Sequence, residues 1–528
     1  MSNHHPRRAP WRSTLYVSAL VTGLALCLVS APAHAGDARF ALIIGHNLSD
    51  DPDLAPLRYA DDDALRYAEL FGAEAEETVL LTTFDAETRT LLGDRAPEAS
   101  TPTRAAVADA LRTLQRGMDA ARARGERPVL VFTYSGHGSY DAEGRGFVHL
   151  ADGHFTTRDL FHQVLEGRDD VPIVLVIDAC NAALMVNTRG AGERRPARPS
   201  KLRLEDHPNV GLILASSTAG ETHEWGRYLA GIFSHEVRSA LVGPADLDDD
   251  QRVTFAEVAA FVAAANARVT NPNVRVTPYI RPPLTDPDLA LVDLSSPAFS
   301  ARVRVDARLA GKTYAVDGDL VRYADFNASF DARAGFWLVR TRPTELVIVH
   351  DDREYVVPEA THGDVSLDAL EPRVRTVLSA RGAGSAYFDR TLFHEPYGRD
   401  FAQHYIETYY IEALVVERVT FRPWYENATA WSLVGGGVGA LLTGVGLQLH
   451  THSLARDGRG SWADERQALN DDIDTYQTTA TVLYGVGGAA LVTGVLLFTL
   501  EQPTEVETWR PPLEVELTGN GVRLRADW

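Results

Sequence analysis

Apolar segments alternate with amphipathic segments over the first half of the chain. Runs rich in β-branched residues extend over Arg39 to Gly45, Glu77 to Phe84, Pro128 to Tyr134, Pro172 to Ile177 and Val210 to Ser217. Between and after them, apolar residues recur at helical spacing near 57–71, 101–114, 157–165 and 229–241. Strands that alternate with helices predict an α/β fold with a mostly parallel sheet, flanked by helices, over residues 36–290.

The hydrophobic pattern changes beyond Pro282. Short segments such as FWLVRTR, ELVIVHDD and REYVVPE, separated by polar turns, predict a small antiparallel β domain from 296 to 372. Residues 373–428 form a connector whose stretch from 385 to 415 has a helical pattern. The tail, residues 501–528, is expected to form a hairpin around Asn520 and Gly521.

Two apolar segments precede this tail. Trp431 to Leu449 and Thr479 to Leu500 are each long enough to cross a bilayer, and Gly435 and Gly439 have the spacing that lets two helices approach closely. The alternative is a buried helical hairpin, but near-continuous apolarity favours two membrane spans within 429–500. Arginines lie both between the two segments and outside them, so they do not settle the orientation.

The N-terminus has the pattern of a secretory signal. Three arginines precede an apolar run from Leu15 to Val29, and Ala33 and Ala35 offer small residues for cleavage. Removal of residues 1–35 takes away three arginines and no acid, so the formal charge moves from −21 to −24. An acidic surface of this kind repels nucleic acid, which excludes nucleic-acid partners. We expect an exported protein anchored in the cell-envelope membrane, with its first domains on the periplasmic side.

One cysteine would remain after export. Cys27 lies in the signal segment, so Cys180 would be alone and no intramolecular disulfide would form. A lone thiol is either an inert buried side chain or one kept for its chemistry. Cys180 follows a predicted buried strand, and His137 follows the preceding one. Because ligands of parallel sheets bind at the carboxyl ends of the strands, this placement favours a Cys/His pair with chemistry.

Two other groups of residues invite a metal interpretation. His149 and His154 lie close in sequence, but no further cysteine or spaced acid completes a zinc set with them. An acidic loop places Asp246, Asp248, Asp250, Arg252 and Glu257 at positions 1, 3, 5, 7 and 12 of an EF-hand-like loop, which predicts a Ca²⁺ site. Position 6 is Gln251 instead of glycine, and an acidic helix N-terminus is the equal alternative.

Taken together, these motifs resemble a known family. FALIIG, LRYADDDA, YSGHG, IDAC, LILASS and ADLDDDQRVTFAEV occur in this order between residues 37 and about 268. In this order and spacing they resemble the caspase-like cysteine peptidases, the clan of caspases, metacaspases and bacterial relatives. The resemblance covers the first half of the chain and none of residues 296–528.

The resemblance implies roles for named residues. Cys180 would attack the scissile carbonyl and His137 would assist proton transfer, while the backbone N–H groups of Gly138 and Cys180 would form the oxyanion hole. One departure concerns the segment after the cysteine, where the family's His-Ser-Gly is Asn181-Ala182-Ala183.

The resemblance also bears on specificity. Asn181 stands where aspartate-specific caspases carry arginine, and by their positions in the motifs Asp63, Ser135 and Asp178 would line an acidic pocket that selects arginine or lysine. Each carboxylate has an alternative interpretation: Asp63 as a helix-start acid, with Asp61 and Asp62 competing for its role, and Asp178 as a strand-end residue that binds local backbone N–H groups.

The sequence therefore predicts a membrane-tethered, exported cysteine endopeptidase that cleaves polypeptides after basic residues. The basic segment 187–203 is either a solvated loop or a site of self-cleavage. Two further hypotheses stay open. One is a catalytically silent caspase-like scaffold that recruits partners at the envelope, and the other is a calcium-sensing envelope protein. The peptidase hypothesis requires no cofactor, and Ca²⁺ is an optional ligand that the acidic loop suggests.

Overall fold

The computed structural model describes residues 36–186, 204–215, 224–271, 275–276, 278–331, 333–374, 385–410, 416–421, 427–457, 459, 463–499, 503–509, 513–518 and 521–526. The predicted signal segment, residues 1–35, and the basic loop, residues 187–203, lie outside this range. The chain divides into two compact units, one formed by Met1–Ala413 with Pro512–Trp528 and the other by Leu414–Pro511.

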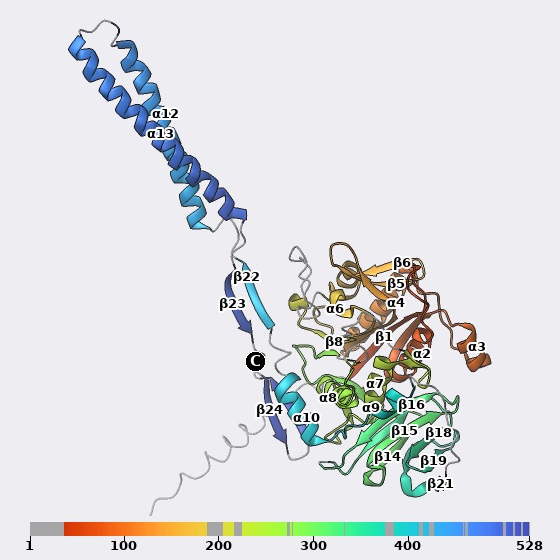
Figure 1. The fold of residues 1–528 in the computed structure, drawn as a ribbon. Coiled ribbons are helices and arrows are strands. Elements are labelled where there is room, and N and C mark those ends of the chain that lie inside the picture. Colours follow the sequence, from red (N-terminus) through yellow and green to blue (C-terminus); the bar gives the residue numbers. More distant parts are fainter. Residues whose placement is uncertain are drawn as a thin grey trace, which may run out of the picture. The chain divides into compact units, whose positions relative to one another are not determined.

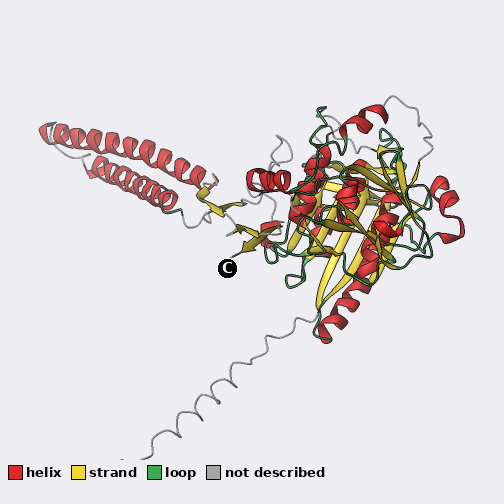
Figure 2. Cartoon of the chain, turned by 90° about the horizontal axis from the view of Figure 1, so that it is seen from below, coloured by secondary structure: helices red, strands yellow, loops and turns green. Residues whose placement is uncertain are grey.

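A six-stranded sheet forms the centre of the first unit (Figures 1 and 2). Its strand order is β12-β8-β7-β3-β1-β2, and all pairs are parallel except β12 with β8. This confirms the predicted mostly parallel sheet. The strands are β1 (Asp37–His46), β2 (Ala75–Thr82), β3 (Arg127–Gly136), β7 (Ile173–Asp178), β8 (Val210–Leu214) and β12 (Tyr279–Arg281).

Side chains of β1 alternate between the two faces of the sheet, and each face is covered by helices. Ile44 belongs to the core that α4 (Arg104–Ala123) covers with Val107, Leu111 and Leu114. Gly45 faces the opposite side, where α2 (Ala60–Glu74) packs so closely that an added Cβ would lie 2.4 Å from the carbonyl oxygen of Ala60. The near-continuous apolar runs in the sequence are those of strands buried on both faces.

The predicted helices form. Thr103 caps α4, because the Thr103 side chain accepts a hydrogen bond from the Ala106 N–H at 3.1 Å. The predicted helix near 157–165 is a short α5 (Thr157–Asp159) that continues as a π-helical turn, η2 (Leu160–Leu165). The other helices are α3 (Ala86–Leu92), α6 (Ala182–Met185), α7 (Ile232–Leu241) and α8 (Phe255–Asn266), with a 3₁₀ turn η1 (Gly93–Arg95) after α3.

A small antiparallel sheet follows the His137 strand, and sequence reasoning did not find it. It consists of β4 (Gly138–Tyr140), β5 (Gly146–Leu150) and β6 (Gly153–Thr156), in the order β4-β5-β6. Two further pairs are β9 (Glu224–Trp225) with β10 (Ala230–Gly231), and β11 (Arg252–Thr254) with β13 (Ala290–Asp293). The β5–β6 hairpin holds His149 and His154 opposite each other.

The segment predicted as a β domain is rich in strands that form two sheets. One sheet has the order β17-β14-β20 and the other β16-β15-β18-β19-β21. Pairing is antiparallel as predicted except between β14 and β20, which are parallel. The strands are β14 (Ala301–Asp306), β15 (Gly311–Asp317), β16 (Arg322–Ala328), β17 (Gly335–Arg340), β18 (Leu346–His350), β19 (Arg353–Val357), β20 (Gly363–Ser366) and β21 (Arg373–Val374).

Residues beyond 374 contribute short helices and the tail. Helices α9 (Ser385–Thr391) and α10 (Arg399–Tyr405), followed by the turn η6 (Ile406–Tyr410), occupy part of the stretch predicted to be helical. In the tail, β24 (Leu513–Thr518) pairs antiparallel with β25 (Gly521–Ala526), as the predicted hairpin requires.

The second unit contains two long helices, α12 (Ala428–Asp457) and α13 (Ala463–Thr499), which pack against each other. Both are long and apolar enough to cross a membrane. The expected role of Gly435 and Gly439 is wrong, since nothing lies within 4 Å of a Cβ added at either. Gly437 and Gly487 meet instead: an added Cβ at Gly437 would lie 2.7 Å from the Gly487 carbonyl oxygen.

Strands flank this helical hairpin on both sides. The strand β22 (Val416–Phe421) precedes α12, β23 (Pro503–Trp509) follows α13, and the two pair antiparallel over their length. The entry and the exit of the second unit are therefore joined by backbone hydrogen bonds.

A buried ionic network joins α7 to β16 in the first unit. Arg322 donates two hydrogen bonds to the Asp325 carboxylate, each at 2.7 Å, and His235 on α7 contacts the same carboxylate at 2.9 Å. All three side chains are buried. Burial alone would raise the pKa of Asp325, but Arg322 and His235 hold it below its usual range, while burial lowers the pKa of His235 to about 4. A neutral His235 therefore donates to an ionised Asp325.

Replacement of Asp325 should destabilise the first unit severely. In Asp325→Ala, Arg322 would be a buried charge without its carboxylate, and such losses cost about 3–5 kcal/mol. Urea unfolding of the full chain at pH 7 measures this. Glu87→Ala is the control, because the Arg58–Glu87 pair is exposed and pairs of that kind contribute about 0–1 kcal/mol. Equal urea midpoints for the two variants would contradict a stabilising role of the network between α7 and β16.

Candidate active site

The register of the central sheet brings His137 and Cys180 to the same edge. Ser135 of β3 pairs directly with Asp178 of β7. His137 lies two residues beyond Ser135, and Cys180 lies two residues beyond Asp178, so both follow the carboxyl ends of neighbouring parallel strands. The predicted juxtaposition of a histidine and a cysteine thus has a direct basis in the strand pairing.

The imidazole of His137 is fixed by a backbone carbonyl. Its Nε2 lies 3.0 Å from the carbonyl oxygen of Ala55, in the segment between β1 and α2. A carbonyl oxygen only accepts, so Nε2 carries the proton and Nδ1 is left as the basic nitrogen. Burial lowers the pKa of His137, against a smaller opposing effect of the Ala55 carbonyl. At neutral pH the ring is uncharged and is able to accept a proton.

Cys180 lies at a sharp turn between β7 and α6. Its side chain is partly exposed. The next residue, Asn181, has φ 57°, in the left-handed region that asparagine tolerates better than most side chains. The Leu184 N–H donates to the Asn181 carbonyl at 2.8 Å and so closes the turn. The departure Asn181-Ala182-Ala183 from the family pattern is therefore compatible with a tight strand-to-helix turn at the cysteine.

Gly138 approaches the backbone of Cys180 more closely than any side chain would allow. A Cβ added at Gly138 would lie 2.3 Å from the Cys180 carbonyl oxygen and 3.0 Å from the Cβ of Ala179. The two residues assigned to the oxyanion hole are thus neighbours in space, as an oxyanion hole built from their N–H groups requires.

Among the three acids at the start of α2, Asp63 alone points toward the Asp178 side of the sheet. Asp61 accepts hydrogen bonds from Asn47 Nδ2 at 2.6 Å and from the Asp85 N–H at 2.9 Å. Asp62 accepts one from the Thr88 hydroxyl at 3.3 Å. Of the three acids that the sequence left in competition, Asp63 is the one whose carboxylate lies near that of Asp178.

Asp63 and Asp178 converge on Gly231, the residue before α7. An added Cβ at Gly231 would lie 2.9 Å from Asp178 Oδ2 and 3.0 Å from Asp63 Oδ2. Asp63 accepts a hydrogen bond from the Gly231 N–H at 2.9 Å, and Asp178 accepts hydrogen bonds from the Ser234 N–H at 3.2 Å and hydroxyl at 2.6 Å. Asp178 therefore binds a helix far away in the chain, not local N–H groups. Ser135, its partner in the register, is also buried.

The two carboxylates differ in charge compensation. Arg238 of α7 donates to Asp63 Oδ1 at 3.2 Å, so Asp63 already has a cationic partner, while Asp178 accepts its hydrogen bonds from the uncharged Ser234. Burial raises the pKa of Asp63 well above its ordinary value and that of Asp178 to about 6. Asp178 is thus ionised at neutral pH, and Ser234, which donates two hydrogen bonds to it, is uncharged.

The acidic loop adopts the sharp turn that its sequence makes difficult. Gln251, at the glycine position, has φ 68°. Carboxylate oxygens of Asp246, Asp248 and Asp250 lie within 4.8 Å of one another, and Asp246 Oδ1 is buried without a hydrogen-bond partner in the described part of the chain. Burial raises the pKa of Asp246 to about 7 and of Asp248 to about 6.

The other two predicted ligands of this loop have different surroundings. Glu257 caps α8: its carboxylate accepts from the Thr254 N–H at 2.9 Å and the Leu247 N–H at 2.9 Å. Arg252 is exposed and its N–H donates to Asp250 Oδ1 at 2.8 Å. The acidic helix N-terminus that the sequence allowed is present, and three of the predicted Ca²⁺ ligands lie together as a cluster of carboxylates.

One cluster near His137 escaped the sequence analysis. Asp50, which lies far before His149 and His154 in the chain, contacts both histidines. No pattern in the sequence signalled that this acid would join them, because the contact depends on the unpredicted β5–β6 hairpin. The basic segment 187–203, for which a solvated loop and a self-cleavage site are the two predicted alternatives, lies outside the described residues.

Part of the chain matches a known protein family. Residues 38–285 match the family model described as the caspase domain. Two solved structures align with the chain: a protein of Geobacter sulfurreducens (17% identity, 46% of this chain and 92% of that chain, TM-score 0.29), and pro-sf-caspase-1 (13% identity, 47% of this chain and 86% of that chain, TM-score 0.27). No curated protein matches the chain.

Proposed function

We propose, from the match of residues 38–285 to the caspase domain model, that the protein is a cysteine endopeptidase with Cys180 as nucleophile and His137 as base. The observation that carries the proposal is the register of β3 and β7, which brings the two residues to one edge of the sheet. The neutral imidazole takes the thiol proton through Nδ1 while the Ala55 carbonyl holds Nε2–H.

The proposed reaction follows from these roles. The Cys180 thiolate attacks the scissile carbonyl carbon, and the N–H groups of Gly138 and Cys180 stabilise the negative oxygen that develops. The imidazolium returns its proton to the leaving amine, and water then hydrolyses the thioester with the same histidine as base. The tight turn at Asn181 supports this assignment, because it exposes the cysteine at the strand end.

We assign the preference for arginine or lysine chiefly to Asp178. Asp63 is already paired with Arg238, so a substrate guanidinium would find its partner in Asp178, with Ser135 beside it in the register. Gly231 lets both carboxylates approach its backbone, because an added Cβ would lie 2.9 Å from Asp178 Oδ2 and 3.0 Å from Asp63 Oδ2. Bidentate pairing would favour arginine over lysine.

Membrane tethering and export complete the proposal. The length and apolarity of α12 and α13 support tethering. Export to the periplasmic side rests on the signal-like pattern of residues 1–35, and self-cleavage rests on the arginines of residues 187–203. The alternative function is a silent scaffold at the envelope, favoured by the unusual Asn181-Ala182-Ala183 segment.

Peptide hydrolysis tests the proposed activity and its specificity together. The full chain, reduced and in detergent, should cleave fluorogenic peptides ending in Arg or Lys but not those ending in Asp or Leu. Cys180→Ala and His137→Ala should abolish cleavage while the thermal midpoint shows that the protein is folded. Absence of any cleavage by folded, reduced protein, with and without Ca²⁺, would favour the scaffold.

Asp178→Asn should lower kcat/KM for an arginine peptide roughly 10- to 100-fold, because a hydrogen bond between charged groups contributes about 1.5–3 kcal/mol. Asp62→Asn is the matched control, one residue from Asp63 on the same helix and hydrogen-bonded to Thr88 instead. A similar loss in both variants would argue against a specific role of Asp178.

The affinity for an arginine peptide should depend on pH. Burial raises the pKa of Asp178 to about 6, so the carboxyl group becomes protonated as pH falls through about 6 and loses its attraction for a guanidinium. Fluorescence anisotropy with the Cys180→Ala protein should show binding that is strong at pH 7.5 and weaker at pH 5. Binding to Asp178→Asn in the same background should vary much less, and an unchanged pH profile there would contradict the assignment.

We also propose that the acidic loop binds Ca²⁺. Support comes from the three clustered carboxylates, from the buried Asp246 Oδ1 and from the left-handed Gln251 that makes the turn. Ca²⁺ should raise the thermal midpoint of the full chain, and by mass action about 2.7 kcal/mol is gained at a hundredfold excess over Kd. Asp248→Asn should remove the shift. A shift of equal size in that variant would place the ion elsewhere.

A further inference from the structure

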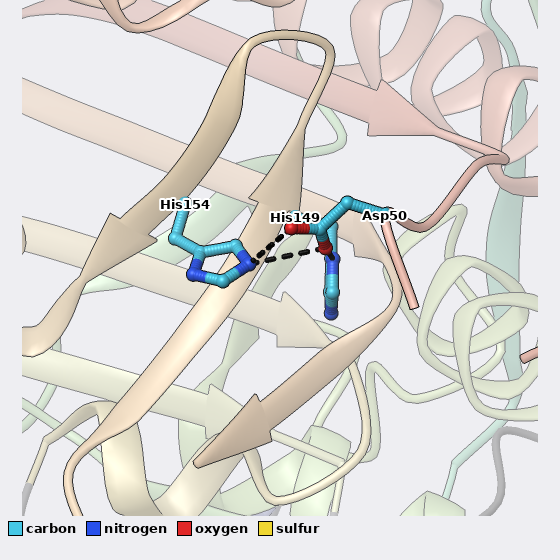
Figure 3. Close-up of side chains that lie close together, drawn as sticks. All are labelled: Asp50, His149 and His154. Atoms are coloured by element: carbon cyan, nitrogen blue, oxygen red, sulfur yellow. Dashed lines mark hydrogen bonds and ion pairs between the residues drawn. The ribbon is translucent and has the colours of Figure 1, made fainter. Parts of the chain in front are cut away.

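Asp50, His149 and His154 form a cluster beside the catalytic histidine. Their ligand atoms all lie within 4.8 Å of one another. His149 Nδ1 is 2.6 Å from Asp50 Oδ1, and His154 Nε2 is 3.0 Å from Asp50 Oδ2. Figure 3 shows both imidazole rings beside the same carboxylate. The β1–α2 segment and the β5–β6 hairpin thus present three nitrogen or oxygen atoms to a common point.

The two histidines are positioned by the β5–β6 hairpin. His149 and His154 are directly opposite in the antiparallel register, which places their side chains on the same face. His149 is buried, with 3% of its side chain exposed. The ring of Phe147 stacks on His154 with centroids 3.9 Å apart. The hairpin therefore holds both rings in place before any ligand arrives.

The donor set suits a borderline transition metal ion. Two imidazole nitrogens and one carboxylate oxygen, with a fourth position for water, form a familiar Zn²⁺ environment. Ligand atoms in a tetrahedral zinc site lie about 3.3 Å apart, given bonds of about 2.0–2.1 Å. The observed separations of 2.6 and 3.0 Å need to open only slightly. The Asp50 side chain is 59% exposed and that of His154 is 35% exposed, so the fourth position faces solvent.

The cluster touches the surroundings of His137 from two sides. The segment between β1 and α2 supplies Asp50, and the same segment supplies the Ala55 carbonyl that receives His137 Nε2–H. On the other side, the His149 N–H donates to the His137 carbonyl at 3.1 Å. An ion shared by Asp50 and the hairpin would join the two segments that hold the catalytic histidine.

We propose that Asp50, His149 and His154 bind one Zn²⁺ ion that clips the β1–α2 segment to the β5–β6 hairpin next to His137. The ion would neutralise the carboxylate and replace its contacts with the two imidazoles. Binding requires both imidazoles to offer a lone pair, so it competes with their protonation. The site is separate from the acidic loop, whose carboxylates suit hard cations. The binding itself does not depend on peptidase activity.

Zinc titration of the full-length Cys180→Ala protein in detergent tests the site. Removal of the thiol prevents Zn²⁺ from binding to the Cys180–His137 pair, so the remaining ion reports on the cluster. Isothermal titration should give one Zn²⁺ per chain, and Co²⁺ should give the visible absorption of tetrahedral coordination. No binding at ~100 μM Zn²⁺, or an octahedral Co²⁺ spectrum, would overturn the proposal.

Variants locate the ion. His154→Ala and Asp50→Asn, both at solvent-accessible positions, should each weaken Zn²⁺ binding by at least about tenfold. His162→Ala is the matched control. His162 is an exposed histidine on η2 that pairs with Glu166, so its replacement should leave Zn²⁺ binding unchanged. Asp248→Asn controls for the acidic loop. Zinc affinity equal to that of the parent in His154→Ala and Asp50→Asn would refute the assignment.

Hydrogen exchange tests the clip. In the Cys180→Ala parent, Zn²⁺ should slow amide exchange in residues 47–59 and 146–156, and the effect should be absent in His154→Ala. Zinc binding without protection of either segment would overturn the role of the ion in holding the surroundings of His137.

Discussion

Helix α7 is the element on which the candidate site depends, because its side chains contact both the buried acids of the site and the β-rich segment. Ser234 and Arg238 hold the buried carboxylates of Asp178 and Asp63, while His235 contacts Asp325 of the β-rich segment. These groups are buried, so none of them can move without leaving a polar atom or a charge unpaired. The positions of Asp63 and Asp178 are therefore fixed by a network that begins in a different sheet.

The sequence was sufficient for features that depend on local pattern. Near-continuous apolar runs predicted the buried parallel strands, and the residues following those strands predicted that His137 and Cys180 would share an edge. Both predictions depend on the spacing of apolar residues and on the direction of the strands, which can be recognised in a single sequence. The order of motifs predicted a resemblance to the caspase-like peptidases, and residues 38–285 match the caspase domain model.

Features that depend on long-range contacts could not be predicted in this way. Among the three adjacent acids on α2, Asp63 was assigned only from its position in a motif, because a rotation of about 100° per residue decides which acid faces Asp178. The β5–β6 hairpin was missed, and with it the meeting of Asp50 with two histidines. Gly437 and Gly487 replaced Gly435 and Gly439 at the helix contact for the same reason: the spacing permits several faces and packing selects one.

The pairing of β22 with β23 has a consequence for topology. Because hydrogen bonds join the strand that enters the helical hairpin to the strand that leaves it, both chain ends of that unit emerge from the same end of α12 and α13. If the hairpin spans a bilayer, the caspase-like domain and the C-terminal tail share one compartment, and the polar stretch between the two apolar segments reaches the other. The helical hairpin would then anchor the protein while the chain returns to the side of the membrane from which it entered.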